Sequence, residues 1–143
     1  MKQQDKKRMS RFQGRGLAVA VLLIAAASPA FAHHGFDAEF TLTRPVTLTG
    51  VVTKVDWINP HAYFYLDVKD KSGKTVNWAF ETQNPGQLHH NGMQRDMVPI
   101  GATVTIDAYG ARIPNKPLAW ITRIHFKDGR SIVISDPNAD AKK

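Results

Sequence analysis

The stretch HAYFYLDVK, residues 61–69, decides the fold of this chain. Apolar residues occupy its even positions, as Ala, Phe, Leu and Val, while His, Tyr, Tyr and Asp occupy the odd positions before the final lysine. Successive side chains of a β-strand point to opposite faces, so this alternation predicts a strand with one buried face and one polar face. The turn sequence DKSG at residues 70–73 then leads into another strand, marked by Val76, Trp78 and Phe80.

A strand is also expected before this stretch, at about Val46–Trp57. Its apolar residues alternate with threonines, and Gly50 in its middle indicates a bend or a bulge. After the hairpin, Asn84 in the N-cap position followed by Pro85 predicts the start of a short helix, and Gly92 is its expected end. The remaining period-2 segments predict two more strands and a short edge strand, at about residues 102–110, 118–126 and 131–134.

The order of these elements predicts the fold class. Three strands, a short helix and two further strands are typical of an all-β domain with one short helix, folded as a small five-stranded OB-like barrel. In such a barrel a long first strand with a glycine in its middle can belong to both sheets, and a small β-sandwich is the alternative. We expect the domain at residues 45–135, after an N-terminal segment at 33–44 and before a disordered tail at 136–143.

Residues 1–32 have the pattern of a cleaved export signal. A basic stretch precedes an apolar run at residues 17–27, and Ala30 and Ala32 then provide the small residues of a signal-peptidase site. The run is shorter than the roughly 20 residues of a membrane-spanning helix, so no stable membrane anchor is expected after cleavage. No Arg-Arg pair precedes the run, which favours the general secretion pathway and a periplasmic location.

The charge of the chain is concentrated in this signal. The 143 residues include 19 Lys and Arg against 12 Asp and Glu, a formal net charge of +7. Residues 1–32 hold six of the basic residues and one of the acidic ones, which leaves 13 against 11 and a net charge of +2. A nearly neutral domain gives no indication of a nucleic-acid partner.

The absence of cysteine excludes disulfides, thiolate zinc sites and thiol catalysis. Familiar hydrolase motifs are also missing, and the carboxylates are scattered along the chain, so the sequence does not indicate an enzyme. Nitrogen and oxygen atoms are therefore the strong metal ligands that this chain can offer.

The histidines indicate a metal site. Cleavage of the signal would make His33 the first residue of the mature chain, next to His34. Its amine and its Nδ1 could then chelate a metal, and one further imidazole would complete a three-nitrogen arrangement that suits Cu(II). The pKa of a terminal amine, about 8, is low enough for a metal to displace the proton. His61 is the first choice for that imidazole, with His89 and His90 as the other candidates, and we predict a copper site at His33, His34 and His61.

A metal-free interaction module is the alternative function. His33 and His34 would then be an ordinary chain terminus, and His61 would only hydrogen-bond a loop carbonyl. A face with Tyr63, Tyr65 and Tyr109 would bind a saccharide, a peptide or a partner protein, because OB-type domains hold ligands near their second strand. A copper oxidase or oxygenase is the weaker third hypothesis, since the sequence shows no substrate groove. Packing is the role expected of the large aromatic residues Trp57, Trp78 and Trp120.

The chain resembles a family of uncharacterised exported proteins, a domain of unknown function found mainly in Gram-negative bacteria. Its most specific parts are the His-His start of the mature chain and the Asn-Pro-His segment that ends at His61. Family members often carry Ser where this chain has Gly35, so a hydroxyl that could orient the imidazoles is missing here. The resemblance covers nearly the whole mature chain and implies export and a small β domain, with no established activity. It is carried by residues 33–36, 46–52, 57–62, Trp78 and 101–104.

Overall fold

The structure is a computed structural model that describes the backbone of residues 33–137 and the side chains from Phe36 onward. The predicted signal peptide, its cleavage site at Ala30 and Ala32, and most of the predicted tail therefore lie outside the described residues. The chain divides into two compact units, residues 1–35 and 36–143, and the second contains the β domain. No helix within residues 33–137 is long and apolar enough to cross a membrane.

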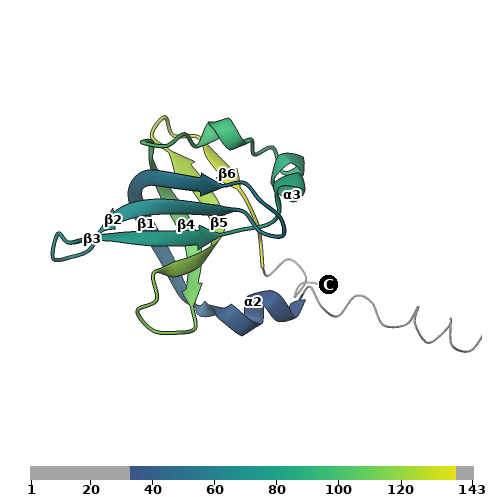
Figure 1. Ribbon diagram of the computed structural model, residues 1–143. Helices are drawn as coiled ribbons and strands as arrows, with labels where there is room; N and C mark the ends of the chain where they lie inside the picture. Colours follow the sequence, from purple (N-terminus) through teal and green to yellow (C-terminus); the bar gives the residue numbers. More distant parts are fainter. Residues whose placement is uncertain (1–32, 138–143) are drawn as a thin grey trace, which may run out of the picture. The chain divides into compact units, whose positions relative to one another are not determined.

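The fold is all-β, which confirms the predicted class. The described chain contains six strands, two short α-helices and one 3₁₀ turn. A helix before the first strand adds to the single helix that the sequence predicts. Along the chain (Figure 1) the elements are α2 (His33–Glu39), β1 (Phe40–Asp56), β2 (Tyr63–Lys69), β3 (Thr75–Glu81), α3 (Pro85–His90), η1 (Arg95–Met97), β4 (Thr103–Ala111), β5 (Leu118–Phe126) and β6 (Ser131–Val133).

The strands form one sheet that closes into a ring. Their order is β3-β2-β1-β4-β5-β6, and neighbours in this order are antiparallel. A short parallel contact between residues 79–81 of β3 and residues 118–120 of β5 closes the ring. The order and the closure fit the predicted OB-like arrangement, with β6 added beside β5.

Gly50 allows β1 to pair with strands on both sides. Residues 40–51 of β1 pair with β4, and residues 50–56 pair with β2, so the two ladders overlap at this glycine. A Cβ atom at Gly50 would lie 2.6 Å from the carbonyl oxygen of Asp67 and 2.9 Å from Cγ2 of Val68. The strands approach too closely here for a side chain. The shared pairing at this glycine is as predicted, whereas the register shift of β1 lies beyond it, between Val52 and Lys54.

The first strand begins at Phe40, six residues before the predicted start at Val46. Pro45 marks a break in the sequence pattern because proline has no N–H to donate. The structure tolerates it, since this half of β1 pairs on one side only, with β4. Phe40 is 1% exposed, so part of the predicted N-terminal segment 33–44 belongs to the packed domain.

The interior of the ring contains the apolar residues predicted for the strands, and α3 adds Leu88 to the same core. Asn84 caps α3 as predicted, accepting a hydrogen bond of 2.9 Å from the backbone N–H of Gln87. The helix ends at His90, and Gly92 beyond it has a positive φ of 84°, as its predicted role as a helix stop requires. On strands β2 to β5, the largest fully buried side chains of this core are Phe64, Leu66, Phe80, Ile106, Ile121 and Ile124.

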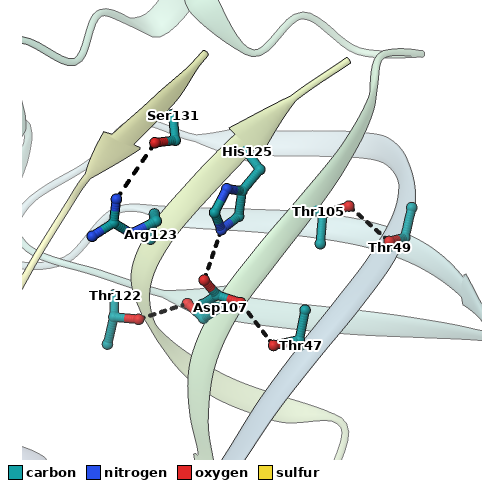
Figure 2. Close-up of polar contacts among 8 residues, drawn as sticks. All are labelled: Thr47, Thr49, Thr105, Asp107, Thr122, Arg123, His125 and Ser131. Atoms are coloured by element: carbon teal, nitrogen blue, oxygen red, sulfur yellow. Dashed lines mark hydrogen bonds and ion pairs between the residues drawn. The ribbon is translucent and has the colours of Figure 1, made fainter. Parts of the chain in front are cut away.

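A polar network on the outer surface links three neighbouring strands (Figure 2). Asp107 of β4 accepts hydrogen bonds of 2.7 Å from the hydroxyl of Thr47 on β1 and of 2.7 Å from Nε2 of His125 on β5. Thr122 donates to the backbone oxygen of Asp107 at 3.0 Å, next to a register shift between β4 and β5. The carboxylate of Asp107 therefore connects β1, β4 and β5.

Gly50→Ala is expected to lower the free energy of unfolding by about 1–3 kcal/mol, because its methyl group overlaps the backbone of β2. Urea denaturation followed by circular dichroism measures this change. Val51→Ala is the matched control, since Val51 is 43% exposed on the same strand and should cost less than about 1 kcal/mol. Equal losses for the two variants would show that the contact at Gly50 carries no special constraint.

Asp107→Asn is expected to change how stability depends on pH. Burial tends to raise the pKa of Asp107, but hydrogen bonds from His125 and Thr47 and the charges of His125 and Arg123 outweigh it and lower the pKa. The stabilisation by the carboxylate is then present above the unfolded pKa of about 3.9 and is lost as the pH falls through the folded pKa. Since the side chain of Asp107 is 35% exposed, this stabilisation amounts to about 1 kcal/mol or less.

Denaturation at about pH 7 and about pH 2 checks this prediction. The wild type should be more stable than Asp107→Asn at the higher pH, and the difference should shrink at the lower pH. Ser131→Ala is the control, because Ser131 contacts Arg123 on the same surface but does not bond to Asp107. A difference between wild type and Asp107→Asn that stays constant over this range would contradict the prediction.

Candidate functional site

His61 and Glu81 form a hydrogen-bonded pair beside the closure of the ring. His61 lies at the end of the loop between β1 and β2, and Glu81 is the last residue of β3. Nδ1 of the imidazole contacts Oε1 of the carboxylate. Glu81 is only 5% exposed, whereas the side chain of His61 is 41% exposed. One ring nitrogen is thus fixed by a buried acid, while much of the imidazole stays accessible.

This pair determines which nitrogen of His61 can bind a ligand. An ionised carboxylate accepts hydrogen bonds and cannot donate them, so Nδ1 carries the proton and Nε2 of the neutral imidazole has a free lone pair. Histidine ligands of metals commonly have this arrangement, with a carboxylate on the other ring nitrogen. Among the side chains of residues 36–137, no three of His, Asp or Glu lie close enough together to hold a metal ion. A metal at His61 would therefore need further ligands from outside residues 36–137.

Tyr63 supports Glu81 from the neighbouring strand. The two residues are directly opposite in the β2–β3 pairing. Burial, followed by the charge of Glu81 and a hydrogen bond to it, raises the pKa of the Tyr63 hydroxyl well above its usual value. The phenol stays protonated at neutral pH beside the buried carboxylate of Glu81, which accepts its hydrogen bond from His61.

Trp120 connects His61 with the start of the domain. Its ring lies edge-on to the imidazole of His61, with 5.5 Å between centroids, and its Nε1 donates to Oγ of Ser135 at 2.9 Å. Phe36 of α2 packs edge-on against the same indole at 5.8 Å, and Phe40 lies at 5.8 Å as well. The predicted packing role of Trp120 is consistent with these contacts, which place Phe36 one aromatic ring away from His61.

The loop between β4 and β5 holds the end of α2 in this position. Nε of Arg112 donates to the backbone oxygen of Asp37 at 2.5 Å, and Nζ of Lys116 lies 2.7 Å from Oε1 of Glu39. The backbone N–H of Arg112 also donates to the carbonyl of Glu39 at 2.8 Å. Polar contacts therefore reinforce the aromatic packing of Phe36.

Of the three tyrosines of the predicted ligand face, the structure brings two together. The rings of Tyr63 and Tyr65 stack on β2 with 6.3 Å between centroids, and Nζ of Lys54 lies 5.0 Å from the centroid of Tyr65. Tyr109 lies on β4 and packs edge-on against Phe36 at 6.4 Å. Across the closure of the ring it is opposite Trp120, which pairs with Glu81, and Glu81 is opposite Tyr63. Ligand binding by this face stays a prediction.

Of the other four histidines considered as metal ligands, the structure describes the side chains of His89 and His90. His33 and His34 are the first two residues of α2, and their side chains lie outside the described residues. His89 and His90 are exposed at the end of α3, where neighbouring side chains diverge by about 100°. His89 lines a groove with Trp57 rather than the surroundings of His61.

Glu81 is the site residue that sequence reasoning misses. The alternation of the strand that contains Val76, Trp78 and Phe80 puts Glu81 on the polar face, so the pattern gives no sign that its carboxylate is buried. Counting outward from the predicted turn at residues 70–73 would place Glu81 opposite Ala62. In the structure Asp70 pairs with Lys74, so Glu81 is opposite Tyr63. Its burial could not be foreseen from the hairpin alone, because β5 contributes to it.

Comparisons with known proteins place the chain in a family. Residues 20–118 match the model of a family of unknown function, DUF6152. This confirms the resemblance to an uncharacterised family, whereas export stays a prediction. No curated protein and no solved structure matches the chain significantly. Since the match covers more than half of the chain, the protein belongs to the DUF6152 family of unknown function.

Proposed function

We propose that this protein is a periplasmic copper-binding protein whose mature chain begins at His33. The amine and Nδ1 of His33 and Nε2 of His61 would bind one Cu(II) ion, with His34 as a further imidazole beside them. The observation that carries this proposal is the hydrogen bond between Nδ1 of His61 and the buried carboxylate of Glu81. It holds the imidazole in one orientation and leaves Nε2 as the ligand atom.

The second part of the proposal concerns the start of the mature chain. Phe36 contacts Trp120, and Trp120 contacts His61, with 5.8 and 5.5 Å between the respective ring centroids. The proposal requires that His33, three residues before Phe36 in the sequence, reaches the accessible imidazole of His61.

The chemistry of these ligands favours copper. An amine and two imidazoles form the nitrogen-rich, tetragonal set that suits Cu(II). The chain has no cysteine, so no thiolate of its own competes for the metal or reduces it. Export would separate the site from the thiols of the cytosol.

The N-terminal ligand is tested by comparing two forms of the protein, one that begins at His33 and one that keeps Ala30, Phe31 and Ala32 before it, so that no histidine stands at the third position of the longer form. The first form should bind one Cu(II) with a nitrogen-rich electron paramagnetic resonance spectrum. The second should bind at least about tenfold more weakly, because its His33 amine is part of a peptide bond. Equal affinity and equal spectra of the two forms would rule out the terminal chelate. The mass of the protein isolated from the periplasm checks export and cleavage after Ala32 independently.

The contribution of Glu81 is tested with Glu81→Gln, which keeps the shape of the side chain and removes its charge. Loss of such a carboxylate partner typically weakens metal binding by about 10–100-fold, and we expect a decrease in this range. The matched control is Asp107→Asn, which neutralises the carboxylate partner of His125 instead and should leave the copper affinity unchanged. If a folded Glu81→Gln variant binds Cu(II) as tightly as the wild type, the carboxylate does not prepare His61 for a metal.

A further inference from the structure

A separate groove lies at the end of β1, next to α3 and η1. Its volume is about 520 Å³, within the range of about 300–1,000 Å³ that small-molecule sites occupy. The groove is lined by residues of three segments, the end of β1, the last turn of α3 and the stretch from η1 toward β4. The loop that ends at His61 starts here with Trp57, yet none of the residues of the His61 pair lines the groove. The groove is thus independent of the proposed metal site.

One wall of the groove is apolar and firmly supported. Trp57 packs edge-on against the buried Phe64, with 6.3 Å between the centroids, which fixes the indole as part of the wall. Val98 and Pro99 extend this wall, and Ile100 continues it toward solvent. Ile100 is 71% exposed, more than any other large hydrophobic residue among the described side chains. Covering it with an apolar ligand would remove that surface from water.

Two opposite charges also line the groove. Arg95 and Asp96 are consecutive residues of η1, both are exposed, and both line the groove. A carboxylate ligand would be attracted by Arg95 but repelled by Asp96. An ammonium ligand would be attracted by Asp96 but repelled by Arg95. A ligand that carries both charges matches both side chains at once.

From this combination we infer that the groove binds a zwitterionic ligand with an apolar body, of the size of an apolar amino acid or a dipeptide. The apolar body lies against Trp57 and Ile100, the carboxylate of the ligand pairs with Arg95, and its ammonium group pairs with Asp96. Singly charged amphiphiles of either sign fit the apolar wall but leave one charge of the groove without a match.

Calorimetric titration of the full mature protein with probes of equal apolar body tests this inference. Phenylalanine carries both charges, 3-phenylpropionate only the negative one and phenethylamine only the positive one. The dipeptide leucylphenylalanine carries both charges at a greater separation. The better of the two zwitterions should bind roughly tenfold more tightly than either singly charged probe, since each lost charge-assisted contact weakens binding by about that factor. Which of the two zwitterions binds more tightly also shows whether the groove takes an amino acid or a dipeptide.

Substitutions locate the binding in the groove. Ile100→Ser should weaken binding of the better zwitterion roughly tenfold. Ile113→Ser is the matched control, because Ile113 is 63% exposed in the loop between β4 and β5, and it should leave binding unchanged. Arg95→Gln should weaken the zwitterion and 3-phenylpropionate but not phenethylamine, and Asp96→Asn should weaken the zwitterion and phenethylamine but not 3-phenylpropionate.

The inference is overturned if neither zwitterion binds in a saturable way. It is also overturned if a singly charged probe binds as tightly as the better zwitterion, or if Ile100→Ser binds like the wild type. These results do not depend on copper, because the titrations are carried out on the metal-free protein and the substituted residues do not contact His61. A lack of zwitterion binding therefore does not contradict the proposed metal site, and a lack of copper binding does not contradict the proposed ligand of the groove.

Discussion

The closure of the sheet between β3 and β5 is the constraint on which the rest of the site depends. In an open sheet Glu81 would end an edge strand and face water. The parallel contact pairs Glu81 with Trp120 and leaves the carboxylate only 5% exposed. A buried carboxylate needs a donor, which Nδ1 of His61 supplies. The orientation of His61 is therefore a consequence of the topology of the ring.

The closure also connects the N-terminal part of the domain to this pair. Trp120 presents its indole to His61, Phe36 and Phe40, so that one aromatic side chain contacts both the imidazole and the residues that follow the expected mature N-terminus. Lys116 and Arg112 then fasten the end of α2 through polar contacts. The segment from Phe36 to Phe40 is therefore packed against the side of the ring that carries the His61–Glu81 pair.

The two histidine–carboxylate pairs of the structure differ in ways that suit different roles. His61 uses Nδ1 for its carboxylate, and its Nε2, the nitrogen farther from the backbone, stays open. His125 uses Nε2 to reach Asp107, which is also bonded to Thr47 on a third strand. The second pair links neighbouring strands on an open sheet surface, and the first fixes the orientation of a partly exposed imidazole.

Much of this architecture could be predicted from local patterns, because alternation, turn residues and caps act over a few positions. The strand at 63–69, the cap at Asn84 and a first strand that pairs on both sides around Gly50 are examples. The early start of β1 could not, because Pro45 is tolerated only where pairing is one-sided. The burial of Glu81 could not be predicted either, because the residue is paired with β5, which lies almost 40 residues later in the chain.

The protonation of His61 offers the most direct test of this mechanism. Long-range ¹H–¹⁵N correlation spectra of the metal-free protein, with the imidazole signals assigned through a His61→Gln variant, report which ring nitrogen carries the proton. The hydrogen bond to Glu81 predicts that neutral His61 is protonated on Nδ1 and unprotonated on Nε2. A proton found on Nε2 of the neutral ring would contradict it, because the nitrogen proposed as the metal ligand would then have no free lone pair.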